Sequence, residues 1–159
     1  MLRALRGCRV DAQLHLYGAA GRHARAMRRL LRDFADVPVV DHGYVESPDK
    51  FARMAGHDLY VQYSRSEVFG LALAEAMGVG LPALVSERAA LAATLAAAGA
   101  AVTIPMEPDR AAAVVADALA RPDLLSDVGA RGRVWVRSEC APEAVVPRMD
   151  ALYERALAV

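Results

Sequence analysis

The chain has 159 residues, 19 basic and 19 acidic side chains and a hydrophobic content of 55%. This length suits one domain, and the apolar content is high enough to bury a core, which excludes an intrinsically disordered chain. A formal net charge of zero does not favour nucleic acid as a partner.

The sequence carries no signal typical of a membrane-spanning or secreted chain. No apolar run approaches the roughly 18 residues of a transmembrane helix, and the N-terminus MLRALRGCRV has no apolar core segment. Cys8 and Cys140 do not have metal-ligand spacing. These features predict a cytoplasmic chain with free thiols and no metal site. The arginine-rich segment 3–32 is interpreted as a solvated helix face, with peripheral membrane contact as the alternative.

Short β-rich segments alternate with helical segments along the chain. In chain order, we predict a strand over 12–18, a helix over 22–35, a strand over 37–43, a helix over 48–55, a strand over 58–64, a helix over 70–78, a strand over 81–86, a helix over 87–97, a strand over 100–105, and helices over 108–120, 122–136 and 141–157. This alternation predicts right-handed crossovers and one parallel sheet with helices on both faces, which is a doubly wound, Rossmann-like α/β domain. No repeat or linker indicates a second domain.

Ligands bind such sheets at the carboxyl ends of the strands. Four of the predicted strands end at Gly18, Gly43, Ser64 and Ser86. We therefore expect these residues at one edge of the sheet, and the functional residues in the loops that follow them.

The loop after Ser64 holds the most informative pattern. Glu67 lies ahead of the next helix, and Glu75 lies inside it, in the otherwise apolar sequence FGLALAEAMGVGLP. An acid in such surroundings needs a hydroxyl or cationic partner. The helix N-terminus at Gly70 and Leu71 offers free backbone N–H groups, and glycine lets a diphosphate approach them closely. One loop therefore combines a phosphate site with two acids.

Each of these residues also has a plainer interpretation when taken singly. Two glutamates eight residues apart are usually solvated, and Phe69 is more often packed in a core than against a ligand. The segment Gly18-Ala-Ala-Gly21 is weaker than a dinucleotide fingerprint and is compatible with a simple turn. Only the joint pattern of Glu67, Gly70 and Glu75 favours a binding site.

This joint pattern resembles the signature of the family-4 glycosyltransferases, which are retaining enzymes of the GT-B fold. Glu67 and Glu75 enclose Phe69-Gly70-Leu71, and Gly80 and Pro82 follow at matching offsets. Weaker matches extend the resemblance over most of the chain, at Leu16-Tyr17-Gly18, His42-Gly43-Tyr44-Val45, 55–64 and Leu152-Tyr153.

The resemblance implies a role for each matching residue. Glu67, as the catalytic residue, would face the donor-sugar hydroxyls near the anomeric carbon, and Glu75 would hydrogen-bond the ribose. The backbone amides of Gly70 and Leu71 would hold the diphosphate. The implied donor-binding set is completed by Phe69, Gly18, Gly21 and Gly43, of which Gly18 and Gly21 would line the phosphate side of the cleft. The donor would be a UDP- or GDP-sugar, with no further cofactor and no metal.

The resemblance also implies which part of the enzyme the chain contains. Residues 1–159 would form the C-terminal, nucleotide-sugar-binding domain without its first strand, so that an edge of the sheet is left unpaired or takes a partner strand. The N-terminal acceptor-binding domain, and an Arg and a Lys-Gly pair that contact the diphosphate, would be absent. We therefore expect a donor-binding domain for sugar transfer with retention that is inactive alone. The alternative is a truncated or split-gene fragment that binds nucleotide weakly or pairs with a separate acceptor-domain chain.

Overall fold

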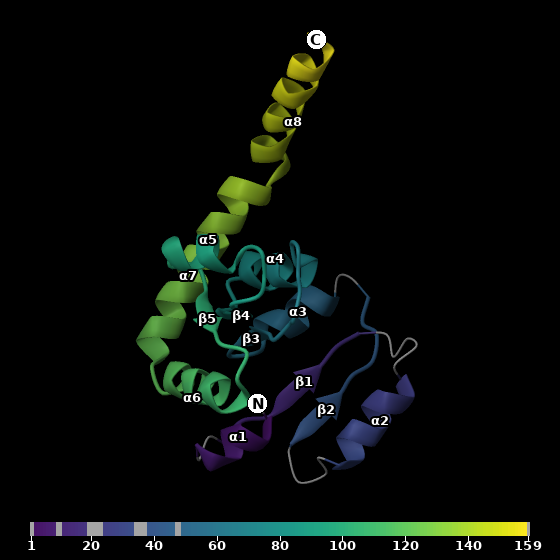
Figure 1. The fold of residues 1–159 in the computed structure, drawn as a ribbon, viewed down its shortest axis with the longest axis vertical. Helices are drawn as coiled ribbons and strands as arrows, with labels where there is room; N and C mark the ends of the chain where they lie inside the picture. Colours follow the sequence, from purple (N-terminus) through teal and green to yellow (C-terminus); the bar gives the residue numbers. More distant parts are fainter. Residues whose placement is uncertain (1, 9–10, 19–23, 34–37, 47–48, 159) are drawn as a thin grey trace.

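Residues 2–8, 11–18, 24–33, 38–46 and 49–158 are described by a computed structural model of the chain. Within these residues the strands are β1 (Leu14–Leu16), β2 (Val39–Asp41), β3 (Tyr60–Gln62), β4 (Ala83–Ser86) and β5 (Val102–Ile104). The helices are α1 (Leu2–Gly7), α2 (Ala24–Asp33), α3 (Asp49–Ala55), α4 (Leu71–Gly78), α5 (Ala92–Ala97), α6 (Pro108–Leu119), α7 (Pro122–Cys140) and α8 (Pro142–Leu157). The predicted alternation of strands and helices is confirmed (Figure 1).

The three C-terminal helices start at clear sequence signals. Each begins with a proline followed by an acidic residue, as at Pro108-Asp109 and Pro122-Asp123. Proline has no N–H to leave unsatisfied at the first helical position, and a carboxylate there interacts favourably with the positive end of the helix dipole. These signals explain why the predicted starts of these helices agree closely with the structure.

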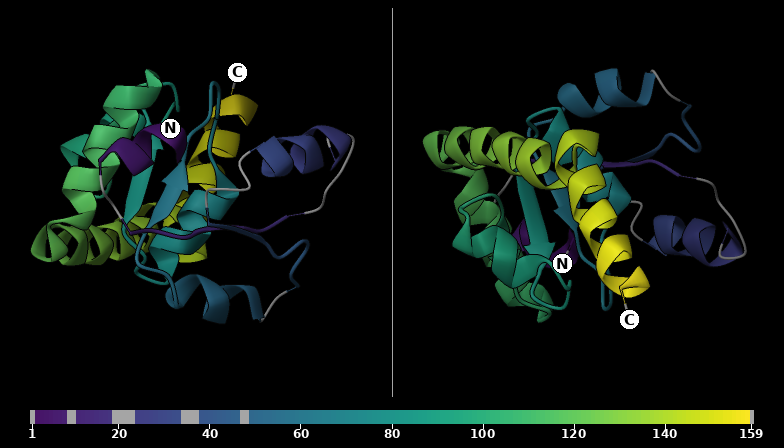
Figure 2. Two further views of the ribbon diagram at one scale, coloured as in Figure 1. Left: turned by 90° about the horizontal axis from the view of Figure 1, so that it is seen from below. Right: turned by 90° about the horizontal axis from the view of Figure 1, so that it is seen from above.

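All strand pairs are parallel, as predicted, but the strands form two sheets. One sheet has the order β1-β2, with Leu14 opposite Val39, and the other has the order β3-β4-β5. Within the described residues, β1 and β3 do not hydrogen-bond to each other, so the predicted parallel sheet is interrupted between them. Figure 2 shows the same strands from two further directions, with α2 beside the smaller sheet.

The core lies on both faces of the three-stranded sheet. β4 is buried at all four positions, and its side chains alternate between the two faces. Ala83 and Val85 join the cluster formed with α4, α5 and α7, while Leu84 joins the cluster formed with α6 and the start of α7. Leu5 of α1 packs against this second cluster. The result is a layer of strands between two layers of helices.

Two glycines allow α7 to approach the sheet closely. A Cβ atom added at Gly129 would overlap with the carbonyl oxygen of Gly80, and one added at Gly132 would lie 3.2 Å from the carbonyl oxygen of Ala100. Both glycines are buried. α7 can therefore lie this close to the turn that follows α4 only because Gly129 and Gly132 have no side chains.

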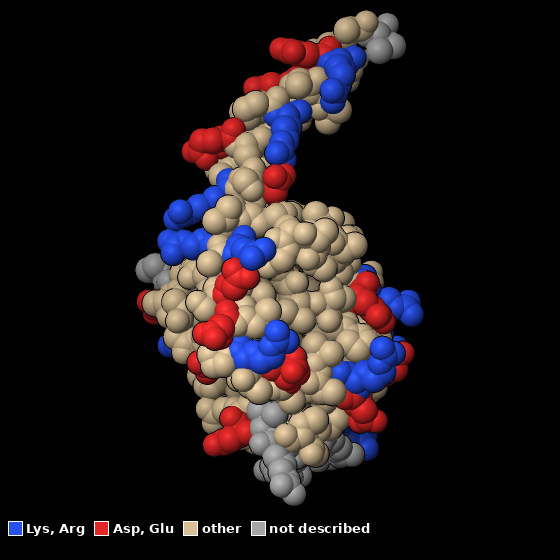
Figure 3. All heavy atoms as spheres, turned by 90° about the vertical axis from the view of Figure 1, so that its left-hand side faces the viewer, with Lys and Arg blue, Asp and Glu red and all other residues tan. Residues whose placement is uncertain are grey.

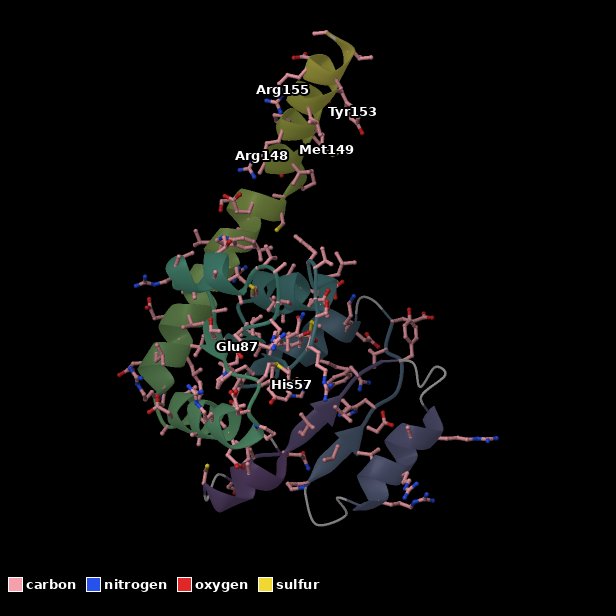
Figure 4. All side chains as sticks on the ribbon, in the orientation of Figure 1. His57, Glu87, Arg148, Met149, Tyr153 and Arg155 are labelled. Atoms are coloured by element: carbon pink, nitrogen blue, oxygen red, sulfur yellow. The ribbon has the colours of Figure 1, made fainter. Side chains whose placement is uncertain are left out.

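The last helix, α8, projects from the body of the molecule (Figures 1 and 3). It has no buried residue. Tyr153 and Met149 lie on one side of it and Arg148 and Arg155 on the other (Figure 4). Basic and acidic side chains intermingle along α8 and over the face of the body shown in Figure 3. None of the helices within the described residues is long and apolar enough to span a membrane.

Candidate functional site

Two of the predicted glycines meet at the carboxyl edge of the smaller sheet. The backbone N–H of Gly18 donates to the carbonyl oxygen of Gly43 over 2.8 Å. Both glycines have positive φ angles, 144° and 65°, and a Cβ atom added at either would meet nothing within 4 Å. The predicted proximity of these two loops is therefore confirmed, and the space beside them is open. Gly21 lies outside the described residues.

The loop that carries Glu67 is fixed to the segment that follows β4. The hydroxyl of Ser86 donates to the carbonyl oxygen of Ser64 over 2.6 Å, so the ends of β3 and β4 lie together as predicted. The backbone N–H of Ala90 donates to the carbonyl oxygen of Glu67 over 2.9 Å, and the Glu67 carboxylate accepts the N–H of Val68 over 3.1 Å. The backbone of Glu67 is held in place, while its half-buried side chain stays at the surface of the loop.

Gly70 forms the start of α4 in a conformation that favours glycine. Its φ and ψ angles are 76° and 72°, and a Cβ atom added there would lie 2.9 Å from Nε2 and 3.0 Å from Oε1 of Gln62. Among the residues that the structure describes, no side chain caps the first turn of α4. The first backbone N–H groups of the helix, beginning at Leu71, are therefore available to an anion.

Gly70→Ala is expected to lower the free energy of unfolding by about 2 kcal/mol, because it combines a left-handed backbone with crowding against Gln62. Gly78→Ala is the control in the same helix. Its added Cβ atom would lie 3.9 Å from Cγ1 of Val136, and it has no positive φ angle. Urea unfolding followed by circular dichroism measures both variants, and equal stabilities would contradict this account of Gly70.

Glu75 has the cationic partner that its apolar surroundings predict. Nζ of Lys50, the only lysine of the sequence, lies 2.6 Å from Oε1 of Glu75. The two side chains retain 30% and 31% of their exposure, so the ion pair stays accessible to a ligand. Sequence reasoning missed Lys50, because nothing in the sequence shows that α3 packs beside α4.

Tyr60 is a further residue of the site that the sequence did not indicate. Burial, followed by the charges of Glu67 and Glu75, raises the pKa of Tyr60 to about 12. Its hydroxyl donates to Oε1 of Gln62 over 3.5 Å. The two glutamates thus act on one half-buried phenol, which remains a neutral hydrogen-bond donor at physiological pH. Both acids therefore lie near enough to Tyr60, the first residue of β3, for their charges to act on it.

The raised pKa of Tyr60 predicts a loss of stability in alkali. Unfolded tyrosine ionises near pH 10 but folded Tyr60 near pH 12, so the folded state binds more protons between these values. Its contribution is complete below pH 10 and is lost as the pH rises through about 12. We expect the free energy of unfolding to fall by up to about 2 kcal/mol more in the wild type than in Tyr60→Phe, measured by denaturant titration across this range. Parallel pH profiles for the two proteins would contradict the assignment.

An apolar groove of about 640 Å³ runs along α4 and joins several of the predicted residues. Phe69, Leu71 and Glu75 line it, opposite Phe51 of α3 and Val145 of α8. Leu71 is 74% exposed and Phe69 is 41% exposed, which contradicts the interpretation of Phe69 as a core residue. Glu67, Gly18 and Gly43 do not line this groove. The predicted site residues therefore fall into two groups. Some line the groove along α4, and the others lie in loops outside it.

Three histidines and a tyrosine from β1, the segment after β2 and the segment before β3 form a cluster of rings. His15 Nδ1 lies 2.8 Å from His42 Nε2, and the Tyr17 hydroxyl lies 2.8 Å from His57 Nε2. Burial, and then the charges of His15 and His42, lower the pKa of His57. The sequence indicated no partner for His42 or His57, because their contacts join distant segments. His57 lies beside β1 in Figure 4.

The sequence matches a known family over most of its length. The family model described as Family 4 Glycosyltransferase in conflict systems covers residues 1–134. The chain belongs to this family of glycosyltransferases. The resemblance drawn from Glu67, Gly70 and Glu75 is thereby confirmed at the level of the family. No curated protein matches the chain.

Solved structures of glycosyltransferases share the fold of this family-4 chain. Sucrose-phosphate synthase from Thermosynechococcus elongatus aligns with a TM-score of 0.82 and 23% identity, over 99% of this chain and 42% of its own. Anabaena Alr3699/HepE, solved in complex with UDP, aligns with a TM-score of 0.79 and 17% identity, over 99% and 44%. A glycosyltransferase from Rickettsia africae aligns with a TM-score of 0.80 and 13% identity, over 98% and 43%. The chain thus spans less than half the length of these GT-B proteins and has the Rossmann-like fold of one half.

Proposed function

We propose that this chain is the donor-binding domain of a retaining glycosyltransferase that uses a nucleotide-sugar. The observation that carries the proposal is that the left-handed Gly70, which begins the helix of Glu75, lies against Gln62, the last residue of β3, with Glu67 in the loop between them. Carboxyl ends of parallel strands are where Rossmann-like domains bind their ligands. Membership of a glycosyltransferase family supports the same reaction class.

The start of α4 supplies what a diphosphate needs. Its first N–H groups have no side-chain cap, and they carry the positive end of the helix dipole. Glu75 lies one turn further along the same helix, where its carboxylate accepts a hydrogen bond from Lys50 through Oε1. In our proposal its other oxygen accepts a ribose hydroxyl, and the apolar groove beside Phe69 and Leu71 receives less polar parts of the ligand.

Glu67 is proposed to act on the sugar. Its loop is anchored through Ala90, so its carboxylate has a defined starting position for hydrogen bonds to donor hydroxyls near the anomeric carbon. Catalysis would consist of positioning together with electrostatic stabilisation of the leaving diphosphate and of an oxocarbenium-like sugar, with retention of configuration. No metal and no cofactor other than the donor is proposed.

UDP- and GDP-sugars are the proposed donors. HepE, one of the proteins with the same fold, has been solved with UDP-glucose, which supports testing uridine nucleotides first. The acceptor-binding surface is proposed to lie on a separate N-terminal domain, because the solved structures extend well beyond the part that this chain matches. The alternative remains a fragment that binds nucleotide weakly or only pairs with such a partner.

The proposed place of action is the cytoplasm, with peripheral contact at the membrane surface as an option. The observation in favour of membrane contact is the exposure of Arg25, Arg29 and Arg32 along α2. Their spacing of three and four residues places them near one another on a helix surface. Such a surface attracts anionic headgroups.

Glu75→Ala is expected to weaken the binding of a nucleoside diphosphate by about 1–3 kcal/mol, or roughly 5- to 150-fold, the range for a lost charged hydrogen bond. Isothermal titration calorimetry with UDP and with GDP, on the 159-residue chain, measures the change.

Lys50→Met is the matched control, because it breaks the same ion pair but keeps the carboxylate. We expect this variant to bind at least as well as Glu75→Ala, and better if the carboxylate contacts ribose. Glu107→Ala, at an exposed pair with Arg110 on α6, should leave the affinity unchanged. Equal affinity of wild type and Glu75→Ala would remove Glu75 from the site. An absence of binding by the wild type would favour the fragment.

A further inference from the structure

Two polar side chains are buried among the residues that the structure describes, those of Gln62 and Ser86. Gln62 is the last residue of β3 and Ser86 is the last residue of β4, so both lie at the carboxyl edge of the three-stranded sheet. The hydroxyl of Ser86 donates to the carbonyl oxygen of Ser64 and is satisfied within the protein. Gln62 is 7% exposed, and its Nε2 has no hydrogen-bond partner within the described residues. Of the two, Gln62 is therefore the one that holds a donor without an acceptor.

The amide group of Gln62 lies directly against the start of α4. A Cβ atom added at Gly70 would lie 2.9 Å from Nε2 and 3.0 Å from Oε1 of Gln62, so the amide approaches the Gly70 backbone as closely as the lack of a side chain allows. The hydroxyl of Tyr60 reaches Oε1 over 3.5 Å and so engages the oxygen of the amide, not the nitrogen. The unpaired donor is therefore buried beneath the residue that begins α4.

Neither acid of the candidate site is the acceptor that Nε2 lacks. Oε1 of Glu75 pairs with Lys50, and Oε1 of Glu67 accepts the backbone N–H of Val68. Neither carboxylate accepts a hydrogen bond from Nε2 of Gln62. A buried donor without an acceptor lowers stability, and such groups are rare in native proteins. Its presence beside a candidate ligand site indicates that the acceptor belongs to the ligand.

The chemistry around Nε2 favours an anionic oxygen as this acceptor. The first N–H groups of α4, beginning at Leu71, have no side-chain cap among the described residues, and they carry the positive end of the helix dipole. An anion held there lies next to Gly70 and therefore close to Nε2. Nε2 has already lost its hydration in the free protein, so a hydrogen bond to an anion requires no further removal of water from this donor. Hydrogen bonds to charged acceptors are also the strong ones.

We propose that Gln62 is a diphosphate-binding residue, whose Nε2 donates to a diphosphate oxygen at the start of α4. A shift of the Gly70 backbone admits this oxygen, because a glycine changes its φ and ψ angles without displacing a side chain. The free protein holds the donor unpaired, and the bound ligand supplies the acceptor. This inference rests on the proposed function, since the diphosphate is that of the nucleotide-sugar. It adds a buried side chain of β3 to the backbone N–H groups of α4.

Gln62→Met tests the proposal, because methionine is also unbranched but has no donor. Without ligand, we expect the variant to melt about 3 °C higher than the wild type in calorimetry, since an unpaired buried donor is removed. We expect its dissociation constants for UDP and for inorganic pyrophosphate to rise about tenfold or more, the effect of a lost hydrogen bond to a charged group. Uridine, which has no phosphate, should bind both proteins equally. Gln62→Leu, a second apolar variant, should behave in the same way. A gain in stability with a loss of affinity is not expected of a merely structural residue.

Gln13→Met is the matched control, because Gln13 is the only other glutamine of the sequence and is exposed just before β1. It should change neither the melting temperature nor the affinities. Unchanged affinity of Gln62→Met for UDP and pyrophosphate would overturn the proposal. Equal losses for UDP and uridine, or a fall in both stability and affinity, would indicate a distorted loop and also overturn it.

The pyrophosphate titration separates this inference from the proposed function. If the wild type binds pyrophosphate but neither UDP nor GDP, the proposed function fails, while the comparison with Gln62→Met in pyrophosphate still decides the role of Gln62. If the wild type binds nucleotide and Gln62→Met binds it equally well, only the inference about Gln62 fails. If the wild type binds none of these anions, both are overturned.

Discussion

Gly129→Ala is expected to lower the free energy of unfolding by about 3 kcal/mol, the largest single-residue effect that we predict. The added Cβ atom would overlap with the carbonyl oxygen of Gly80 and lie 3.4 Å from two ring atoms of Pro82. The oxygen cannot retreat easily, because Gly80 itself has a positive φ angle of 86° and lies one residue before the buried Leu81. α7 would have to move away from α4 and β4, opening the main core.

Gly132→Ala is the matched control on the same helix, with the same gain in helix propensity. Its Cβ atom would lie 3.2 Å from the carbonyl oxygen of Ala100 and 3.5 Å from atoms of Met77. Methionine adapts readily, so we expect a loss of about 1 kcal/mol. Urea unfolding of both variants gives the comparison. If Gly129→Ala is as stable as Gly132→Ala, α7 is free to shift, and close packing at Gly80 is not what positions it.

The isolated 159-residue chain is expected to transfer no sugar, although it contains Glu67. Glycosyl transfer needs a site from which water is excluded and in which the acceptor is positioned. The loop around Glu67 lacks such enclosure, because Val68 is 80% exposed and Leu71 is 74% exposed. In our proposal the acceptor surface lies on a separate domain, so the isolated chain loses the gain in effective concentration that positioning provides. A transfer assay with radiolabelled UDP-glucose and GDP-mannose, sensitive to one turnover per hour, is the measurement.

The assay has a built-in control in Glu67→Gln, which keeps the shape of the side chain but removes its charge. We expect wild type and variant to be equally inactive alone. In a complex that supplies the remaining GT-B domain, we expect the wild type to become active and the variant to lose about 100-fold or more in rate, the size of a lost electrostatic contribution. Turnover by the isolated chain that disappears in Glu67→Gln would show that it is a complete enzyme.

The alternation of strands and helices was predictable because it depends on local patterns. Apolar segments ending in glycine or serine mark the strands, and the Pro-acid pairs at Pro108 and Pro122 mark helix starts. The pairing of strands is not local, so the sequence predicted parallel strands but not the interruption between β1 and β3 that the described residues show. Periodicity indicates that 12–18 and 58–64 are strands, but it does not say which edges meet.

For the same reason, only part of the candidate site could be predicted from the sequence. Glu67, Gly70 and Glu75 share one loop and one helix, so their spacing carried the signal. Lys50 and Tyr60 come from other elements, and only the folded structure reveals the ion pair of Lys50 with Glu75 and the effect of the Glu75 charge on the pKa of Tyr60. The need of Glu75 for a partner could be predicted from its apolar neighbours, but the identity of that partner could not. The roles of the individual site residues in binding and catalysis remain predictions.

Because α8 projects from the body of the molecule, we expect it to populate both helical and unfolded conformations. The helix has 16 residues, about 24 Å of length, no buried side chain, and a proline at position 147 that removes one internal hydrogen bond. Helices of this length are marginal in water when packing does not support them, because nucleation is costly. Its helix–coil equilibrium therefore lies close to balance, apart from the turn that the Arg148–Glu139 ion pair ties to α7. Any surface that covers Met149 and Tyr153 would shift this equilibrium towards the helix. The free energy of binding α8 to that surface therefore includes the cost of ordering the helix.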